Sequence, residues 1–175
     1  ALRQDNLKRR LAYSTISQLS YVVMATAILA PVSIIGAVLH IAAHAIGKIT
    51  LFFAAGSIYT AAHKTKISQL NGIGRKMPWT MGAFSIASLS MIGIPPTVGF
   101  ISKWYILIGA IQSEQIFAIA VIILSTLLNA GYFVPIIYCA FFKEVDNRDD
   151  IDQVNNDHGE APLPIVIALT ITAGG

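Results

Sequence analysis

The side chains best suited to chemistry are titratable groups that lie within apolar stretches of the sequence. His40, His44 and Lys48 are spaced by four positions in LHIAAHAIGKITLFFAAG, residues 39–56. Residues four apart share one face of an α-helix, so the three would be stacked along about 12 Å of its axis. Histidine, with an unperturbed pKa of about 6.5, and a lysine removed from bulk water can both exchange protons. The spacing predicts a buried proton relay, and Lys103 is a fourth candidate.

Two other interpretations of these residues stay open. Buried polar side chains can simply bind carbonyl and hydroxyl groups of neighbouring helices, and a lysine near the membrane surface can extend its ammonium to the interface. Two histidines four positions apart can also bind a metal ion. No third ligand lies near His40 and His44, so we expect no metal and no cofactor. We favour a functional interpretation, because ionisable side chains inside a membrane are costly and usually functional.

The composition is that of an integral membrane protein. Hydrophobic residues make up 55% of the 175 residues and charged residues 12%, with a mean hydropathy of +0.66. A soluble domain usually carries about 25% charged residues, so this chain lacks the polar surface to cover itself in water. Cys139 is the one cysteine, which excludes a disulfide framework within the chain. We expect the bilayer as a partner and no nucleic acid. The missing initial Met and the apolar end suggest an internal fragment of a longer polypeptide.

The apolar segments predict helices that enter the membrane. There are five such segments: 11–30, 33–62, 79–112, 115–142 and 162–175, the last of which is only the start of a helix. Ser33 is the expected N-cap of the second helix. The basic stretch 63–78 and the polar stretch 143–160 are expected to be loops. The first helix carries a polar stripe at 3-and-4 spacing, Ser14, Ser17, Gln18 and Tyr21, for which we expect a packing role.

The segment 79–112 is predicted to be a discontinuous helix. Pro95 and Pro96 remove two backbone donors, and Gly93 and Gly99 relax the chain on either side of them. Either two short helices form a hairpin, or two half-helices cross the membrane once. Broken helices let irregular backbone line a hydrated cavity in transporters, and Lys103 follows the break closely.

The distribution of charge favours the single crossing. With one crossing, every Lys and Arg outside the spans falls on the cytoplasmic side, as the positive-inside rule requires: Arg3, Lys8, Arg9, Arg10, Lys64, Lys66, Arg75, Lys76, Lys143 and Arg148. The nine acidic residues lie at Asp5 or from Glu114 onward. Lys48 and Lys103 therefore have no carboxylate partner within residues 6–113.

Three stretches resemble the antiporter-like membrane subunits shared by respiratory complex I (NADH:quinone oxidoreductase) and Mrp-type monovalent cation/proton antiporters: DNLKRRLAYSTISQLSYV, LHIAAHAIGKITLFFAAGSI and MGAFSIASLSMIGIPPTVGFISKW. The stretch KISQLNGIGRKMPWTMGAF is more similar to the D-type member of the Mrp antiporters. The resemblance covers residues 5–142 and implies a fold of fourteen helices with two inverted five-helix repeats. Residues 1–175 would form a single membrane domain from the second repeat onward.

The resemblance also implies roles for individual residues. Lys48 matches the central proton carrier of the family, and His44 and His40 match histidines on its hydrophilic axis. Lys103 matches the lysine of the discontinuous helix, which exchanges protons with one side of the membrane. The glutamate–lysine pair of the first repeat would lie upstream. Gly47 departs from the bulkier residue expected before the lysine.

The sequence thus predicts an all-α polytopic membrane protein with four transmembrane helices and the start of a fifth, one of them discontinuous. The expected function is proton translocation, with no redox chemistry of its own, in a multisubunit antiporter or NADH dehydrogenase complex. Its expected partners are other membrane subunits, protons and sodium as a second candidate ion. Its expected location is a bacterial or archaeal inner membrane. A subunit that only supports the structure of such a complex is the alternative.

Overall fold

A computed structural model of the chain describes residues 1–143 and residue 167. Within these residues all regular elements are helices: α1 (Leu7–Ala27), α2 (Pro31–Ala62), η1 (Ile67–Gln69), α3 (Ile73–Lys76), α4 (Pro78–Ile92), α5 (Val98–Gln112) and α6 (Ile116–Phe142). Most of the predicted loop 143–160 and of the predicted helix 162–175 lies outside the described residues.

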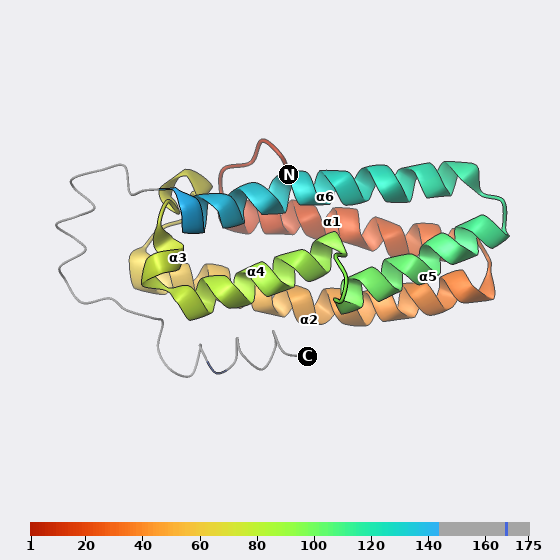
Figure 1. The fold of residues 1–175 in the computed structure, drawn as a ribbon, viewed down its shortest axis with the longest axis horizontal. Helices are drawn as coiled ribbons and strands as arrows, with labels where there is room; N and C mark the ends of the chain where they lie inside the picture. The colour runs from red at the N-terminus through yellow and green to blue at the C-terminus, as the bar shows by residue number, and fades with distance from the viewer. Residues whose placement is uncertain (144–166, 168–175) are drawn as a thin grey trace.

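The long helices form an elongated bundle in which the broken helix takes the place of one member. Figure 1 shows α1, α2 and α6 running along its length, while α4 and α5 follow one another end to end beside α2. A hairpin would have placed α4 and α5 side by side. The arrangement confirms a discontinuous helix made of two half-helices placed end to end.

Two helix starts differ from those predicted. α1 begins at Leu7, earlier than residue 11, because Asn6 caps it by accepting a hydrogen bond from the backbone N–H of Arg9 at 3.1 Å. α2 begins at Pro31, so the expected N-cap Ser33 is wrong. Proline has a fixed φ suited to the first helical position and starts the helix two residues earlier. Ser33 is buried and donates its hydroxyl to the Ala25 carbonyl at 2.6 Å.

The stretch 63–78 is more ordered than the expected loop. It contains η1 and α3, and Ile67, Leu70 and Ile73 are buried at intervals of three residues. Backbone hydrogen bonds join it to the start of α1, from Leu7 N–H to the Thr65 carbonyl at 2.9 Å and from Ile67 N–H to the Asp5 carbonyl at 2.8 Å. This stretch therefore closes one end of the bundle.

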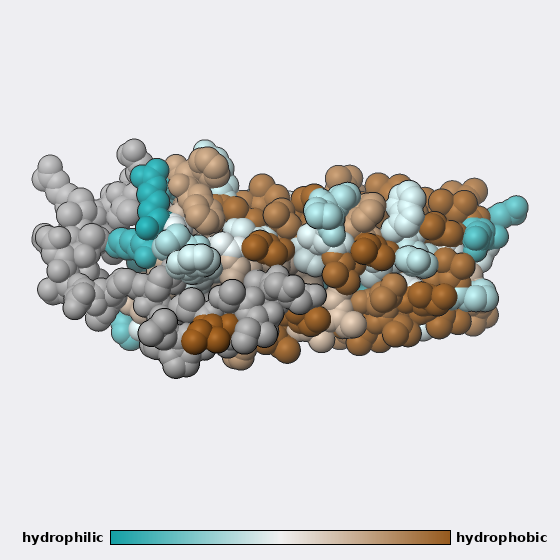
Figure 2. Space-filling view, turned by 60° about the horizontal axis from the view of Figure 1, so that its bottom comes forward, coloured by the Kyte–Doolittle hydropathy of each residue, from teal (hydrophilic) through white to brown (hydrophobic). Residues whose placement is uncertain are grey.

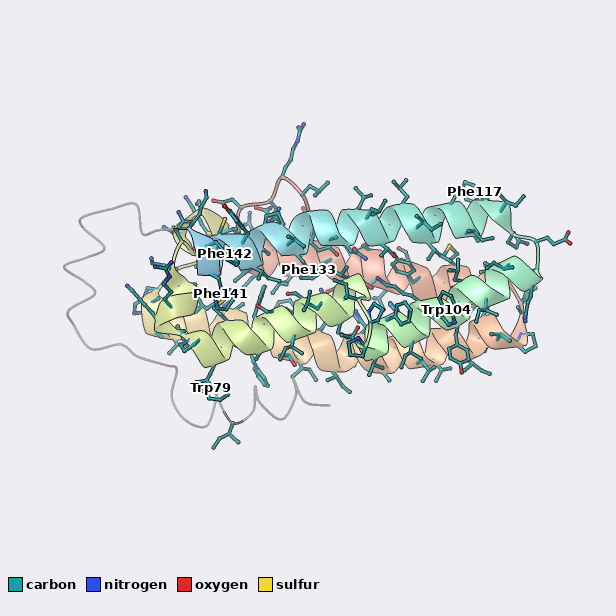
Figure 3. All side chains as sticks on the ribbon, viewed as in Figure 1. Trp79, Trp104, Phe117, Phe133, Phe141 and Phe142 are labelled. Atoms are coloured by element: carbon teal, nitrogen blue, oxygen red, sulfur yellow. The ribbon has the colours of Figure 1, made fainter. Side chains whose placement is uncertain are left out.

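The outer surface of the bundle is apolar. α2 and α6 are long and apolar enough to cross a membrane, and α5 is a shorter apolar helix. On the face shown in Figure 2, hydrophobic residues cover most of the described surface and the strongly hydrophilic ones gather at its ends. Figure 3 shows Phe117 and Trp79 pointing away from the bundle, with 82% and 68% of their surface exposed, whereas Phe133 is fully buried. Such a surface matches a lipid environment.

The interior has a polar layer between two apolar clusters. On α1, Leu11 belongs to one cluster and Tyr21 to the other, and Ser14 and Gln18 lie between them. On α2, Ala37 and Leu51 belong to the two clusters and the stretch 40–48 lies between them. The predicted relay residues on α2 therefore occupy the middle of the bundle.

Candidate functional site

Lys48 is buried at the contact between α1 and α2. Only 7% of its surface is exposed, and its Nζ donates to the Leu11 carbonyl at 2.8 Å and to the Ser14 hydroxyl at 2.7 Å. Both acceptors are neutral oxygens of α1. Hydrogen bonds of a charged donor to neutral acceptors contribute about 1.5–3 kcal/mol each, which offsets part of the cost of removing an ammonium from water. Lys48 is thus held without a carboxylate.

The two histidines continue from Lys48 along the same face of α2. Their ring centroids are 6.4 Å apart with an interplanar angle of 19°, and both rings are buried. His44 interacts electrostatically with Lys48, and His40 interacts with both His44 and Lys103. The predicted order of the groups is therefore present in space: Lys48, His44, His40 and then Lys103.

His40 has a hydrogen-bond partner on α5. His40 Nδ1 lies 3.0 Å from the Ser102 hydroxyl, and that hydroxyl donates to the Gly99 carbonyl at 3.0 Å. The Ser102 hydroxyl can donate its one proton to only one of these two partners at a time, so its orientation is coupled to the tautomer of His40. His40 Nε2 is buried and has no hydrogen-bond partner among the described residues, and the same holds for His44 Nδ1. These atoms can accept a proton in transit.

Lys103 is held by the end of the neighbouring half-helix. Its Nζ donates to the carbonyls of Met91 and Ile92 at 2.9 Å and 2.8 Å. These are the last two residues of α4, whose carbonyls have no partner within their own helix. A helix C-terminus also carries a partial negative charge, which favours a cation there. The break in the helix is what gives Lys103 its acceptors.

Two glycines shape the break. Gly93 ends α4 with φ +89°, a conformation that other residues adopt at a cost. Gly99, in the first turn of α5, lies so close to the Ser90 carbonyl that a Cβ there would overlap with it. The prolines lie between these points, with Pro95 and Pro96 outside both helices. The predicted position of the break is confirmed.

Gly47 also meets a close neighbour. A Cβ at this position would overlap with the Met91 side chain. The atom that it would meet is the terminal methyl of Met91, so the small residue before Lys48 leaves room for this side chain.

The polar stripe of α1 does more than pack. Besides Ser14, which binds Lys48, Gln18 Nε2 donates to the Met91 carbonyl at 3.3 Å, and the Tyr21 ring lies 4.9 Å from the Nζ of Lys103. The spacing of the stripe showed that these residues share a face. The sequence did not indicate which helix that face meets. Ser102 was missed for the same reason.

A metal site here would need more ligands than His40 and His44. Within the described residues, no group of three or more His, Cys, Asp and Glu side chains could hold a metal ion. His40 and His44 remain two ligands without a third. The arrangement brings together groups that each exist in charged and neutral forms, as proton exchange requires.

Comparisons with known proteins show which family the chain belongs to. The family described as "NADH:quinone oxidoreductase/Mrp antiporter, TM" matches residues 1–129. The N subunit of an NADH-quinone oxidoreductase from Desulforudis audaxviator is 43% identical over 143 residues, which are 82% of this chain and 28% of that protein. The D subunit of a Na(+)/H(+) antiporter from Alkalihalophilus pseudofirmus is 35% identical over 176 residues, which are 99% of this chain and 35% of that protein.

The fold is shared with a solved structure. A chain of the Mrp complex from Dietzia sp. superimposes with a TM-score of 0.85 at 22% identity, over 99% of this chain and 39% of that one. The chain spans 28% and 35% of the length of the two curated relatives. The family match extends from α1 into α6 and includes all four predicted site residues. The chain belongs to the membrane family that NADH:quinone oxidoreductases and Mrp antiporters share.

Proposed function

We propose that this chain carries protons through the middle of a membrane, as part of an antiporter-like subunit. The observation that supports the proposal most is the buried line of Lys48, His44, His40 and Lys103, with no carboxylate among residues 6–113. Its relatives named above are subunits of an NADH-quinone oxidoreductase and of a Na(+)/H(+) antiporter. We infer that the chain likewise works in a multisubunit complex, in the inner membrane of a bacterium or archaeon.

Each group in the line has a distinct role in the proposal. Lys48 is the central carrier, which alternates between ammonium and amine. His44 and His40 pass the proton on, because each ring presents one buried nitrogen without a partner among the described residues. Lys103, held by the end of α4, exchanges the proton with one side of the membrane through the break.

The alternative is a chain whose buried polar groups only hold helices together. The contacts that favour it are those of the lysines, because both donate to main-chain carbonyls of a neighbouring helix. A structural lysine would make such bonds too. The two functions differ in what they require of Lys48: a carrier must release its proton, and a structural cation must keep it.

The experiment that tests the proposal is Lys48→Ala in the full-length subunit, within its assembled complex. We expect the complex to assemble and proton transport into vesicles to be lost. The matched control is Lys76→Ala, which removes an exposed lysine at the end of the bundle. Lys48→Ala complexes that assemble and transport protons at the normal rate would contradict the proposal.

The orientation in the membrane is part of the proposal. Lysine and arginine residues favour the cytoplasmic side, so the end of the bundle closed by residues 63–78 would face the cytoplasm. We expect cysteines placed at Ser68 and Lys143 to react with a reagent on the cytoplasmic side, and one at Glu114 with a reagent on the other side. The substitutions are made with Cys139→Ser. Labelling of Ser68→Cys and Lys143→Cys from opposite sides would contradict the single crossing.

A further inference from the structure

A second polar stripe lies on α6, a helix whose sequence is otherwise strongly apolar. Its members are the adjacent pair Ser125 and Thr126, followed at intervals of three positions by Asn129 and Tyr132. Asn129 is fully buried, and 3% of the surface of Tyr132 is exposed. The proposed function assigns no role to these residues. A polar group buried in an apolar helix is costly unless it has a partner, so the contacts of the stripe indicate its purpose.

The stripe faces the polar stripe of α1. The Tyr132 hydroxyl interacts with the side chains of Ser14 and Gln18, and it donates to Asn129 Oδ1 at 2.6 Å. One turn further along, the Tyr21 hydroxyl lies 3.4 Å from the Thr126 hydroxyl. Ser14 is the residue that accepts from Lys48. Ser14 therefore interacts with both the Tyr132 hydroxyl and the proposed proton carrier.

Two atoms beside Tyr132 have unused hydrogen-bonding capacity. Gln18 Oε1, an acceptor, and Asn129 Nδ2, a donor, are fully buried and have no partner among the described residues. A small pocket of about 40 Å³ lies in the same interface, one turn away, and its lining includes Tyr21 and Ser125. A pocket of this size, with the hydroxyls of Tyr21 and Ser125 in its lining, has room for a water molecule. The interface between α1 and α6 thus has unpartnered donors and acceptors beside Tyr132 and room for water one turn away.

We propose that Tyr132 is a further proton-transfer residue, which serves Lys48 through Ser14. The inference rests on the proposed function and deepens it. A proton leaves the Lys48 ammonium for the Ser14 oxygen while the Ser14 hydroxyl proton passes to the Tyr132 oxygen. The Tyr132 hydroxyl then turns from Asn129 Oδ1, and its proton passes to a water that donates to Gln18 Oε1 and accepts from Asn129 Nδ2. The Ser14 and Tyr132 oxygens each gain one proton and lose one, the water becomes hydronium, and Lys48 is left as the neutral amine. Asn129 positions the Tyr132 hydroxyl in this path.

The decisive variant is Tyr132→Phe in the full-length subunit of the assembled complex. It removes one hydroxyl and keeps the ring, which packs 4.7 Å from that of Phe133. We expect proton transport to fall by about threefold to tenfold, a smaller loss than the 10²-fold or more of an obligatory proton-transfer group. The matched control is Tyr138→Phe, which makes the same change at an exposed tyrosine of α6 and should leave the rate unchanged.

Double substitution separates a path from simple packing. If Tyr132 acts through Ser14, adding Tyr132→Phe to Ser14→Ala should slow the residual transport no further. Ser14→Thr, which keeps a hydroxyl, should restore the dependence on Tyr132. If Tyr132→Phe prevents assembly, Asn129→Leu serves instead, because it removes the group that positions the Tyr132 hydroxyl, and we expect the same slowing.

Two results would overturn the inference. One is transport at the wild-type rate by assembled Tyr132→Phe or Asn129→Leu complexes. The other is an equal fractional loss from Tyr132→Phe with and without Ser14→Ala, which would mean that the two hydroxyls act independently. Because Lys48→Ala tests the carrier itself, normal transport by that variant would end the proposed function. Loss of transport in Lys48→Ala with a normal Tyr132→Phe variant would end this inference alone.

Discussion

Lys48 and Lys103 face the same physical problem in two different surroundings. Both are at least 93% buried, since 7% and 6% of their surfaces are exposed, and neither has a carboxylate within residues 6–113. Lys48 lies in the middle of the uninterrupted helix α2 and binds one carbonyl and one hydroxyl of α1. Lys103 lies beside a break and binds two carbonyls at the end of α4.

The difference shows two ways to hold a buried ammonium with neutral oxygens. At Lys103 the acceptors exist because a helix ends there, so the backbone alone supplies them. At Lys48 the neighbouring helix does not end, and a side-chain hydroxyl must be placed within reach. The surroundings of Lys103 should therefore depend on the conformation of the break, and those of Lys48 on the side chains of α1.

Among the substitutions that test this difference between the two lysines, Gly99→Ala should have the largest effect on stability. The new Cβ would overlap with the Ser90 carbonyl, and a backbone atom cannot move aside as a flexible side chain can. We expect the two half-helices to separate and the subunit to lose about 3 kcal/mol of stability. Thermal denaturation of the purified complex in detergent measures this loss.

The control for that variant is Gly82→Ala, within α4. An added Cβ at Gly82 would meet nothing within 4 Å. Alanine is favoured over glycine in a helix by about 0.5–1 kcal/mol, so this variant should be as stable as the wild type or more so. Equal stability of the Gly99→Ala and Gly82→Ala complexes would contradict the close approach of α5 to α4.

Gly93→Ala should cause a smaller loss of stability, through a change in the surroundings of Lys103. The positive φ costs about 1–2 kcal/mol for a residue with a Cβ, and that Cβ would lie 3.0 Å from Cδ of Lys103. We expect a matching loss of stability in the same denaturation assay, together with slower proton transport. A variant that is destabilised yet transports normally would show that Lys103 does not depend on the shape of the break.

The sequence predicted the surroundings of Lys103 better than those of Lys48. Pro95, Pro96 and the flanking glycines indicate a helix break from local backbone chemistry alone. The stacking of His40, His44 and Lys48 likewise follows from helix periodicity within one segment. Both predictions concern residues close together in the chain, where the geometry is set by the peptide backbone.

Contacts between helices could not be predicted from helix periodicity and local backbone chemistry. Ser14 binds Lys48 across 34 positions, and the pairing depends on how α1 and α2 are packed and in which register. Periodicity places Ser14 on a polar face but leaves the direction of that face open. The stripe of Asn129 and Tyr132 on α6 went unnoticed for a related reason, because its few polar residues are surrounded by a long apolar run.

The central claim is that Lys48 releases and takes up a proton, and Lys48→Arg tests it most directly. Arginine keeps a positive charge but does not deprotonate in proteins. The measurement is proton transport by assembled complexes in vesicles, followed by the quenching of a pH-sensitive dye, with Lys48→Ala alongside. The account predicts that both variants assemble and that both lose most of their transport. Near-normal transport by Lys48→Arg would contradict it and would leave Lys48 as a structural cation.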